Sequence, residues 1–188
     1  MKTKFYLLVA VGMLISVATF GQTKFGVHAG INISNERAKA GSVSLSLNSK
    51  VGLQVGGFAE INVSDAFAIQ PELNFSQMGA ELSGIKENLN FLSIPVLAKI
   101  KLGGFGIYAG PQLGLLLSAK DKDNTGSVNV KDSFKSIDFG AIAGAEYTFA
   151  EKIVASARYQ MGLVNTVQGA VGGSLKNSAV TITLGYKF

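Results

Sequence analysis

From Lys24 to the C-terminus, apolar and polar residues alternate with a period of two, the period of a β-strand whose two faces meet different surroundings. The alternation is clearest at residues 178–188, where every second residue is apolar and the residues between them are small or polar. Similar segments recur along the chain, at residues 24–33, 50–61, 66–77, 90–102, 104–118, 136–149, 152–164 and 178–188. The pattern therefore predicts an all-β chain with eight strands.

The connections between these segments alternate in length. Tight turns are expected at residues 62–65, near Gly103 and at residues 150–151. Long polar loops are expected in between, at residues 34–49, 78–89, 119–135 and 165–177. Short turns on one rim and long loops on the other are typical of an eight-stranded antiparallel up-and-down transmembrane β-barrel with OmpX/OmpA-like architecture. We expect the barrel in the cell outer membrane, with both termini periplasmic and the long loops extracellular.

Composition favours the same fold. The chain has 188 residues, of which 47% are hydrophobic and 15% are charged, whereas soluble domains carry roughly 25% charged residues. The apolar content excludes a disordered chain, and no apolar run beyond the first twenty residues is long enough for a spanning helix. In lipid every backbone polar group must be bonded within the protein, which leaves a closed barrel.

Residues 1–21 are predicted to be a secretory signal peptide. Lys2 and Lys4 form its charged start, residues 5–17 are apolar, and small residues precede a cleavage site between Gly21 and Gln22. The alternative is a retained N-terminal membrane anchor. Cleavage leaves residues 22–188 as the barrel domain and lowers the net charge from +5 to +3. With no basic run in the sequence, we expect no nucleic-acid partner.

The apolar face of each predicted strand is expected to contact lipid, and the opposite face to line the lumen. Nearly all strand glycines fall on the lumenal face, and Gly57 is the exception. The lumenal glycines are Gly26, Gly30, Gly52, Gly56, Gly106, Gly110, Gly114, Gly140, Gly144, Gly162 and Gly185. An eight-stranded barrel is only wide enough for side chains to fill it, so we expect a packed lumen.

Most strand charges share the lumenal face, as the cost of charge in lipid requires. They are Glu60, Glu72, Lys99, Lys101, Asp138, Glu146, Arg158 and Lys187. We predict that Glu72, Lys99, Glu146 and Arg158 form a structural charge network at mid-barrel, because acids and bases are mixed there. The alternatives are unpaired charges in water near the rims, and a path for protons or solutes.

Aromatic residues gather on the predicted lipid face near the short-turn rim, at Phe67, Phe149, Tyr186 and Phe188, as in an interfacial girdle. Leu184, Tyr186 and Phe188 also resemble the C-terminal signal that the barrel insertion machinery of the outer membrane reads. Outer-membrane lipid and this machinery are therefore expected partners.

Three prolines interrupt the predicted strands, Pro71, Pro95 and Pro111. Proline cannot donate a ladder hydrogen bond, and a closed barrel has no edge strand to hold it. We expect local bulges or bends in these three neighbouring strands, with an open seam in the wall as the alternative.

Three segments resemble motifs of the PorT-like outer-membrane β-barrel family of the Bacteroidota. Residues 91–99 (FLSIPVLAK) resemble its fourth strand and residues 108–120 (YAGPQLGLLLSAK) its fifth. Residues 138–140 (DFG), with Gly144 and Glu146, are similar to its sixth. The resemblance implies an eight-stranded outer-membrane barrel. PorT itself is linked to type IX secretion of cargo proteins, and most members of the family have no assigned activity.

Residues for catalysis or metal binding are scarce. The chain has no cysteine and one histidine, His28, which excludes disulfides, thiolate chemistry and a multi-histidine metal site. His28 is interpreted as a polar residue that fills the lumen. The acids of residues 121–132 fail the EF-hand spacing and alternate with lysines, so a solvated loop is expected. We predict no catalytic residue, no cofactor and no metal.

The sequence therefore predicts a structural or interaction barrel with a packed lumen, monomeric and not an enzyme, that serves type IX secretion or envelope assembly through secretion-system proteins. A small-solute channel and a ligand-binding or adhesive barrel are the alternatives. Two further hypotheses are disfavoured. A barrel enzyme needs a nucleophile and a base placed together, and the chain has one histidine and no Gly-x-Ser-x-Gly motif. In a soluble lipid-binding barrel the glycines and charges assigned to the lumen would face water.

Overall fold

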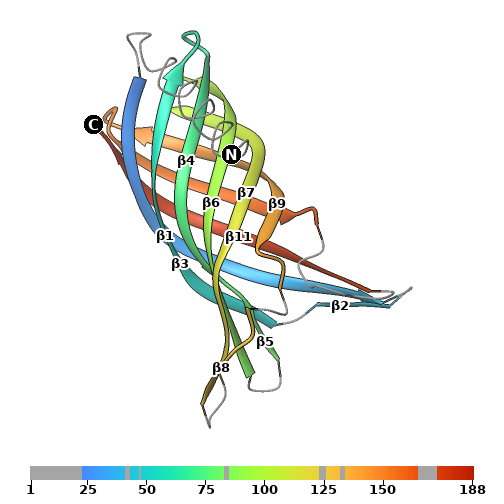
Figure 1. Ribbon diagram of the computed structural model, residues 1–188. Coiled ribbons are helices and arrows are strands. Elements are labelled where there is room, and N and C mark those ends of the chain that lie inside the picture. Colours follow the sequence, from blue (N-terminus) through green and yellow to red (C-terminus); the bar gives the residue numbers. More distant parts are fainter. Residues whose placement is uncertain are drawn as a thin grey trace, which may run out of the picture.

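Eight long antiparallel strands form the wall of a barrel (Figure 1). The computed structural model describes residues 23–40, 43–46, 48–82, 85–122, 126–131, 134–164 and 173–188. The long strands are β1 (Thr23–Ala40), β3 (Asn48–Asn62), β4 (Phe67–Met78), β6 (Ile85–Leu102), β7 (Phe105–Lys122), β9 (Ile137–Phe149), β10 (Ile153–Gly162) and β11 (Gly173–Lys187). Three short strands, β2 (Val43–Ser46), β5 (Ala80–Leu82) and β8 (Ser127–Asn129), extend the wall at one end.

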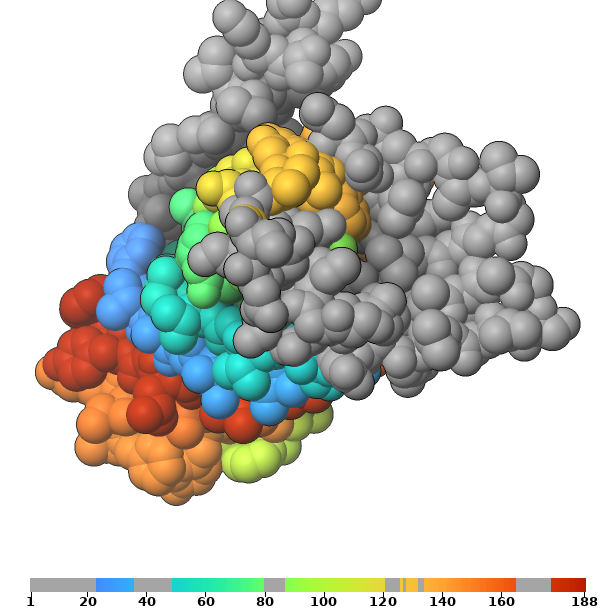
Figure 2. All heavy atoms as spheres, turned by 90° about the horizontal axis from the view of Figure 1, so that it is seen from below, coloured from blue at the N-terminus to red at the C-terminus, as the bar shows by residue number. Residues whose placement is uncertain are grey.

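The barrel closes through β1, which pairs with β3 on one side and with β11 on the other. Gly26 of β1 lies opposite Phe58 of β3 and also opposite Lys187 of β11. In the end view of Figure 2 the red C-terminal strand lies beside the blue N-terminal strand. The eight predicted strands are therefore confirmed as a closed antiparallel barrel. The predicted signal peptide lies outside the described residues, and the domain boundary stays a prediction.

The two ends of the barrel differ, and we call them the short-turn end and the long-loop end. The short-turn end carries the tight connections at residues 63–66, 103–104 and 150–152, together with Thr23 and Phe188. Gly103 has a φ of +66°, and Ala150 and Glu151 have φ values of +46° and +64°. Such left-handed residues let a two- or three-residue connection reverse the chain.

At the long-loop end, the expectation of simple polar loops is wrong in part, because strands continue well past the apolar stripe. β1 runs to Ala40 and pairs there with both β2 and β11. β6 begins at Ile85, β7 runs to Lys122, and β5 and β8 pair with them. Ladder hydrogen bonds join backbones, so a polar stretch can extend a strand wherever a neighbour continues beside it. In Figure 1 two β-ribbons diverge from the barrel at this end.

Side chains alternate between lumen and outer surface as the sequence pattern predicts. In β4, every second residue from Ala68 to Met78 is buried, and along β11 the outward Leu184 is 65% exposed while its neighbour Thr183 is buried. The lumenal side also carries the predicted glycines, whereas Gly57 faces outward, where a Cβ would make only an ordinary contact. The part of the chain that the structure describes contains no helix long and apolar enough to cross a membrane.

The three prolines lie diagonally across the adjacent strands β4, β6 and β7. Each is bridged to one neighbour, Pro71 to Val96, Pro95 to Gln112, and Pro111 to Ala141. On its other side each proline falls in a gap between bridged pairs, and the register is the same before and after the gap. The prolines thus interrupt the ladders without producing the bulges that the sequence led us to expect, and the described wall has no open seam.

One bulge does occur in this wall, but at a different place. The register between β6 and β7 shifts between Asn90 and Phe91, which leaves Leu117 of β7 as the extra residue. The shift reverses the facing of the residues that follow, so that both Leu116 and Ala119 are buried on the lumenal side. The bulge therefore sets which residues of β7 enter the lumen at the long-loop end.

Gly110 gives a test of how closely the strands approach beside the prolines. A Cβ at this position would overlap the carbonyl oxygen of Val96 in β6. We expect Gly110→Ala to destabilise the barrel by about 1–3 kcal/mol through overpacking. Gly57→Ala is the matched control, because its Cβ would meet only the carbonyl oxygen of Gly26, at 3.5 Å. Urea unfolding in lipid vesicles measures both variants, and equal stabilities would contradict this account.

Candidate functional site

The lumen is the candidate functional site, and its contents change in layers along the barrel axis. A cavity opens at the short-turn end, ion pairs follow, then a belt of amides and hydroxyls, and an apolar cluster lies at the long-loop end. Each layer draws its side chains from several strands, because inward residues of neighbouring strands lie side by side.

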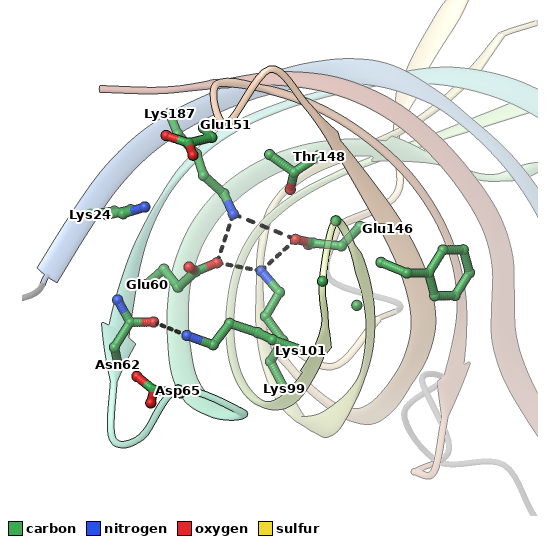
Figure 3. Close-up of a pocket in the computed structure, with 14 residues that line it drawn as sticks. Lys24, Glu60, Asn62, Asp65, Lys99, Lys101, Glu146, Thr148, Glu151 and Lys187 are labelled. Carbon is green, nitrogen blue, oxygen red and sulfur yellow. Dashed lines mark hydrogen bonds and ion pairs between the residues drawn. The ribbon is translucent and has the colours of Figure 1, made fainter.

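The cavity at the short-turn end, which we call the vestibule, has a volume of about 420 Å³. Charged side chains of both signs line it (Figure 3). Lys24, Asp65 and Glu151 lie around its rim, and Lys101 donates a hydrogen bond to Asn62 at 2.7 Å. The vestibule is therefore polar and has no dominant charge.

A ring of alternating charges closes the vestibule from below. Lys99 Nζ lies 2.6 Å from Glu60 Oε2 and 2.6 Å from Glu146 Oε1. Lys187 Nζ lies 2.9 Å from the same Glu60 oxygen and 3.7 Å from the same Glu146 oxygen. All four side chains are buried and point toward one another in Figure 3. We call these four residues the ion-pair ring.

A second, deeper pair lies beyond the ring. Arg158 Nη1 contacts Glu72 Oε2 at 2.6 Å, and both side chains are almost completely buried. The Arg158 guanidinium also lies over the Tyr108 ring, 5.5 Å from its centre. Gln70 joins the two layers, because its oxygen accepts from Lys99 at 2.7 Å and its nitrogen donates to Glu72 at 2.8 Å.

The structure brings the four predicted network residues into this region as two pairs, Glu72 with Arg158 and Glu146 with Lys99. Gln70 connects the pairs. Sequence reasoning placed Glu60 and Lys187 on the lumenal face but missed them as members of the network. The strand register could have shown that Glu60 and Lys187 belong to the network. The short turns fix which strand ends lie at the same level of the barrel, and both residues lie near such ends.

His28 lies in the same layer as Arg158. Its Nε2 is hydrogen-bonded to Asn74 Oδ1 at 2.9 Å, and its ring stacks on Phe58 with the ring centres 5.9 Å apart. Asn74 in turn donates to Glu72 Oε2 at 2.9 Å. His28 thus fills the lumen as a bonded polar residue. The described residues include no group of three or more His, Cys, Asp or Glu side chains that could hold a metal ion.

A belt of amides and hydroxyls crosses the lumen between the ion pairs and the long-loop end. Gln160 donates to Thr181 at 2.8 Å and to Gln54 at 3.2 Å, and Ser76 also donates to Gln54. Thr181 donates in turn to Asn32. These buried groups come from five strands and bond to one another across the barrel, so they occupy the lumen at this level, although Gln54 Nε2 and Gln160 Oε1 have no hydrogen-bond partner.

An apolar cluster fills the lumen at the long-loop end, and we call it the apolar plug. Its members are Met78, Leu89, Phe91, Leu116, Ala119, Phe134 and Ala179. Phe134 belongs to the segment expected to be a solvated loop, yet it is 8% exposed, and Val130 packs beside it. The solvated-loop expectation is wrong at these two residues, because the narrow mouth offers an apolar surface that a folded-back loop can bury. Asp123, Asn124 and Asp132 lie outside the described residues.

The predicted girdle and C-terminal signal residues lie on the outer surface. Leu184, Tyr186 and Phe188 are exposed there, and Tyr186 and Phe188 pack edge to face with ring centres 5.7 Å apart. Phe149 packs in the same way on Tyr147, at 4.6 Å. Phe67 begins β4 at the same end. The role of the last strand in insertion stays a prediction.

Comparison with known proteins places this barrel in a family. Residues 20–168 match the family model described as outer membrane protein beta-barrel domain. The chain belongs to this family. Membership places it in the outer membrane.

Solved outer-membrane barrels share the fold at low sequence identity. Neisserial surface protein A aligns at 14% identity and a TM-score of 0.62, over 89% of this chain and 99% of that one. Ail of Yersinia pestis, in complex with the heparin analogue sucrose octasulfate, aligns at 16% identity and a TM-score of 0.52, over the same shares. No curated protein matches the chain.

The Arg158–Glu72 pair provides a test of the deeper layer. Glu72→Gln should destabilise this outer-membrane barrel by about 3–5 kcal/mol, because it leaves the buried Arg158 guanidinium without a counter-charge. The double variant Glu72→Gln/Arg158→Met should recover part of the loss. Reversible urea unfolding in vesicles measures the cycle.

Asp65→Asn is the control for this cycle, since Asp65 is exposed at the short-turn end, and we expect a change within about 0.5 kcal/mol. Additive losses in the double variant would show that the two side chains do not act as a pair.

Proposed function

We propose that this outer-membrane barrel is a structural or interaction protein that acts through its two rims and not through its lumen. The observation that carries the proposal is the filled lumen. Ion pairs, an amide belt and the apolar plug succeed one another along the axis among the described residues. A solute would have to displace buried charge pairs and a packed apolar cluster to pass.

We infer that the short-turn end faces the periplasm and the long-loop end the exterior. The asymmetry of the two ends supports this orientation, because outer-membrane barrels carry short periplasmic turns and longer external loops. In this orientation the vestibule opens to the periplasm, and the strand extensions of β1, β6, β7 and β11 stand outside the cell.

A role in type IX secretion or envelope assembly is the finer part of the proposal. Its support is the resemblance of residues 91–146 to the PorT-like family. An interaction barrel needs exposed surface that the membrane does not cover, and Val128 on β8 is such a position, with 65% of its surface exposed. No catalytic role is proposed, since His28 is engaged by Asn74 and Phe58.

The second candidate is an adhesive or ligand-binding barrel. The observation that favours it is the continuation of paired strands beyond the barrel, which gives the long-loop end a structured surface. Ail has the same fold and was solved with a heparin analogue bound. At 16% identity the likeness to Ail concerns the fold alone. Ligand binding by this chain is therefore a proposal.

Bilayer recording tests the closed lumen. We expect purified protein in planar bilayers to give no steady stepwise conductance, with an open porin as the positive control. Phe134→Ser should also remain closed, because the amide belt and the ion pairs lie beneath the plug. Steady conductance by the unmodified chain would favour the small-solute channel.

Site-specific photo-crosslinking in native outer membranes tests the interaction role. A photoreactive residue at Val128 should capture a protein in stoichiometric yield, whereas the same residue at Leu184 should contact lipid alone. The two positions are equally exposed, 65% each, but Leu184 lies on the apolar outer face. A polysaccharide captured at Val128 would favour the adhesive barrel, and capture of nothing at either position would contradict both roles.

A further inference from the structure

The vestibule has the size and the lining of a site for a small ligand. Its volume of about 420 Å³ falls within the range of ligand pockets, roughly 300–1,000 Å³. The ion-pair ring closes it from below, and each of the four ring side chains is more than nine-tenths buried (Figure 3). A ligand that enters the vestibule therefore meets charged groups that the barrel wall holds in fixed positions.

Two charged groups of the lining have unused hydrogen-bonding capacity. Both ring lysines approach the same oxygen of Glu60, Oε2, and its other oxygen, Oε1, has no hydrogen bond among the described residues. Oε1 is not one of the buried unbonded atoms, so it is open to the vestibule that Glu60 lines. Lys101 Nζ donates one hydrogen bond, to Asn62 at 2.7 Å, and an ammonium has three hydrogens. The vestibule thus offers both a negative acceptor and a positive donor.

The acceptor and the donor lie at successive levels of the barrel. Asn62, which binds Lys101, follows Glu60 by two residues on β3, and Lys101 follows Lys99 of the ring by two residues on β6. Both strands run toward the short-turn end, and alternate residues of a strand are about 6.4–6.8 Å apart. The donor therefore lies about one such step closer to the rim than the acceptor.

The charges that line the vestibule balance one another. A ligand with one net charge would leave that charge uncompensated there, whereas a zwitterion keeps the balance. Its lining among the described residues includes four lysines and four carboxylates, namely Lys24, Lys99, Lys101 and Lys187 with Glu60, Asp65, Glu146 and Glu151.

We propose that the vestibule binds a zwitterionic dipeptide, with its α-ammonium at Glu60 Oε1 and its α-carboxylate at Lys101. An extended chain spans about 3.3–3.6 Å per residue, so two residues separate the terminal charges by about the spacing of the two levels. A single amino acid is too short to reach both groups. The ion-pair ring stops the dipeptide from going deeper, so it binds without passing through. Binding of this kind needs no protein partner and is separate from the interaction role proposed above.

NMR titration of the whole chain in lipid nanodiscs tests this site, with alanyl-alanine as the probe. We expect saturable shifts of the amide signals of Gly103 and Gly104, which line the vestibule, and none at Leu89 in the apolar plug. N-acetylation or C-amidation of the probe removes one terminal charge. Each should weaken binding at least about tenfold, because a charge-assisted hydrogen bond is lost. Free alanine should also bind at least about tenfold more weakly, for the same reason.

Lys101→Met tests the contact with the carboxylate. In this variant alanyl-alanine and its C-terminal amide should bind equally, because the group that distinguishes them is gone. Lys152→Met is the matched control, since Lys152 is exposed at the same end and its ammonium lies over the Tyr186 ring on the outer surface, 5.9 Å from the ring centre. The control should keep the full effect of amidation.

The peptide series is measured on the unmodified chain, so it decides the proposal even if Lys101→Met does not fold. No saturable shift with alanyl-alanine would overturn the site, and equal affinities for the dipeptide and its acetylated form would overturn the choice of a zwitterion. Equal binding of free alanine would overturn the assigned length. An effect of amidation that survives in Lys101→Met would overturn the assigned lysine.

Discussion

The rest of this structure depends on closure of the hydrogen-bonded wall. In a bilayer no backbone donor or acceptor can turn to water, so β1 has to meet β11 as well as β3. Eight strands make a narrow cylinder, and the charges that lipid rejects have nowhere to go except into it. The lumen is therefore crowded with polar groups that must satisfy one another, and their order along the axis is what distinguishes this barrel.

That order explains why the lumen is closed in more than one way. The ion-pair ring and the Arg158–Glu72 pair resist passage because separating buried opposite charges is costly. The apolar plug resists it by excluding water. Gln70 and Asn74 connect the charge layers to their neighbours through hydrogen bonds. Among the described residues, charge pairs, amides and the apolar plug thus follow one another along the axis.

The fold could be predicted from sequence almost completely, because a period of two decides which residues face lipid and which face the lumen. The site could be predicted only in part. The alternation within one strand decides whether a residue faces lipid or lumen, so Glu60 and Lys187 were placed inward. Their contact with each other depends on the register between strands that are far apart in the chain. Phe134 was missed because a loop that folds back leaves no periodic signal.

The three prolines of β4, β6 and β7 also matter for the unfolded chain, before the barrel has formed. An exported chain rich in alternating strands must cross an aqueous compartment unfolded, where identical segments of different copies can stack into cross-β assemblies. Pro71, Pro95 and Pro111 deny three consecutive strands an unbroken row of donors. The same residues that interrupt the finished ladders therefore act as gatekeepers against self-association, at positions where the folded wall tolerates the loss.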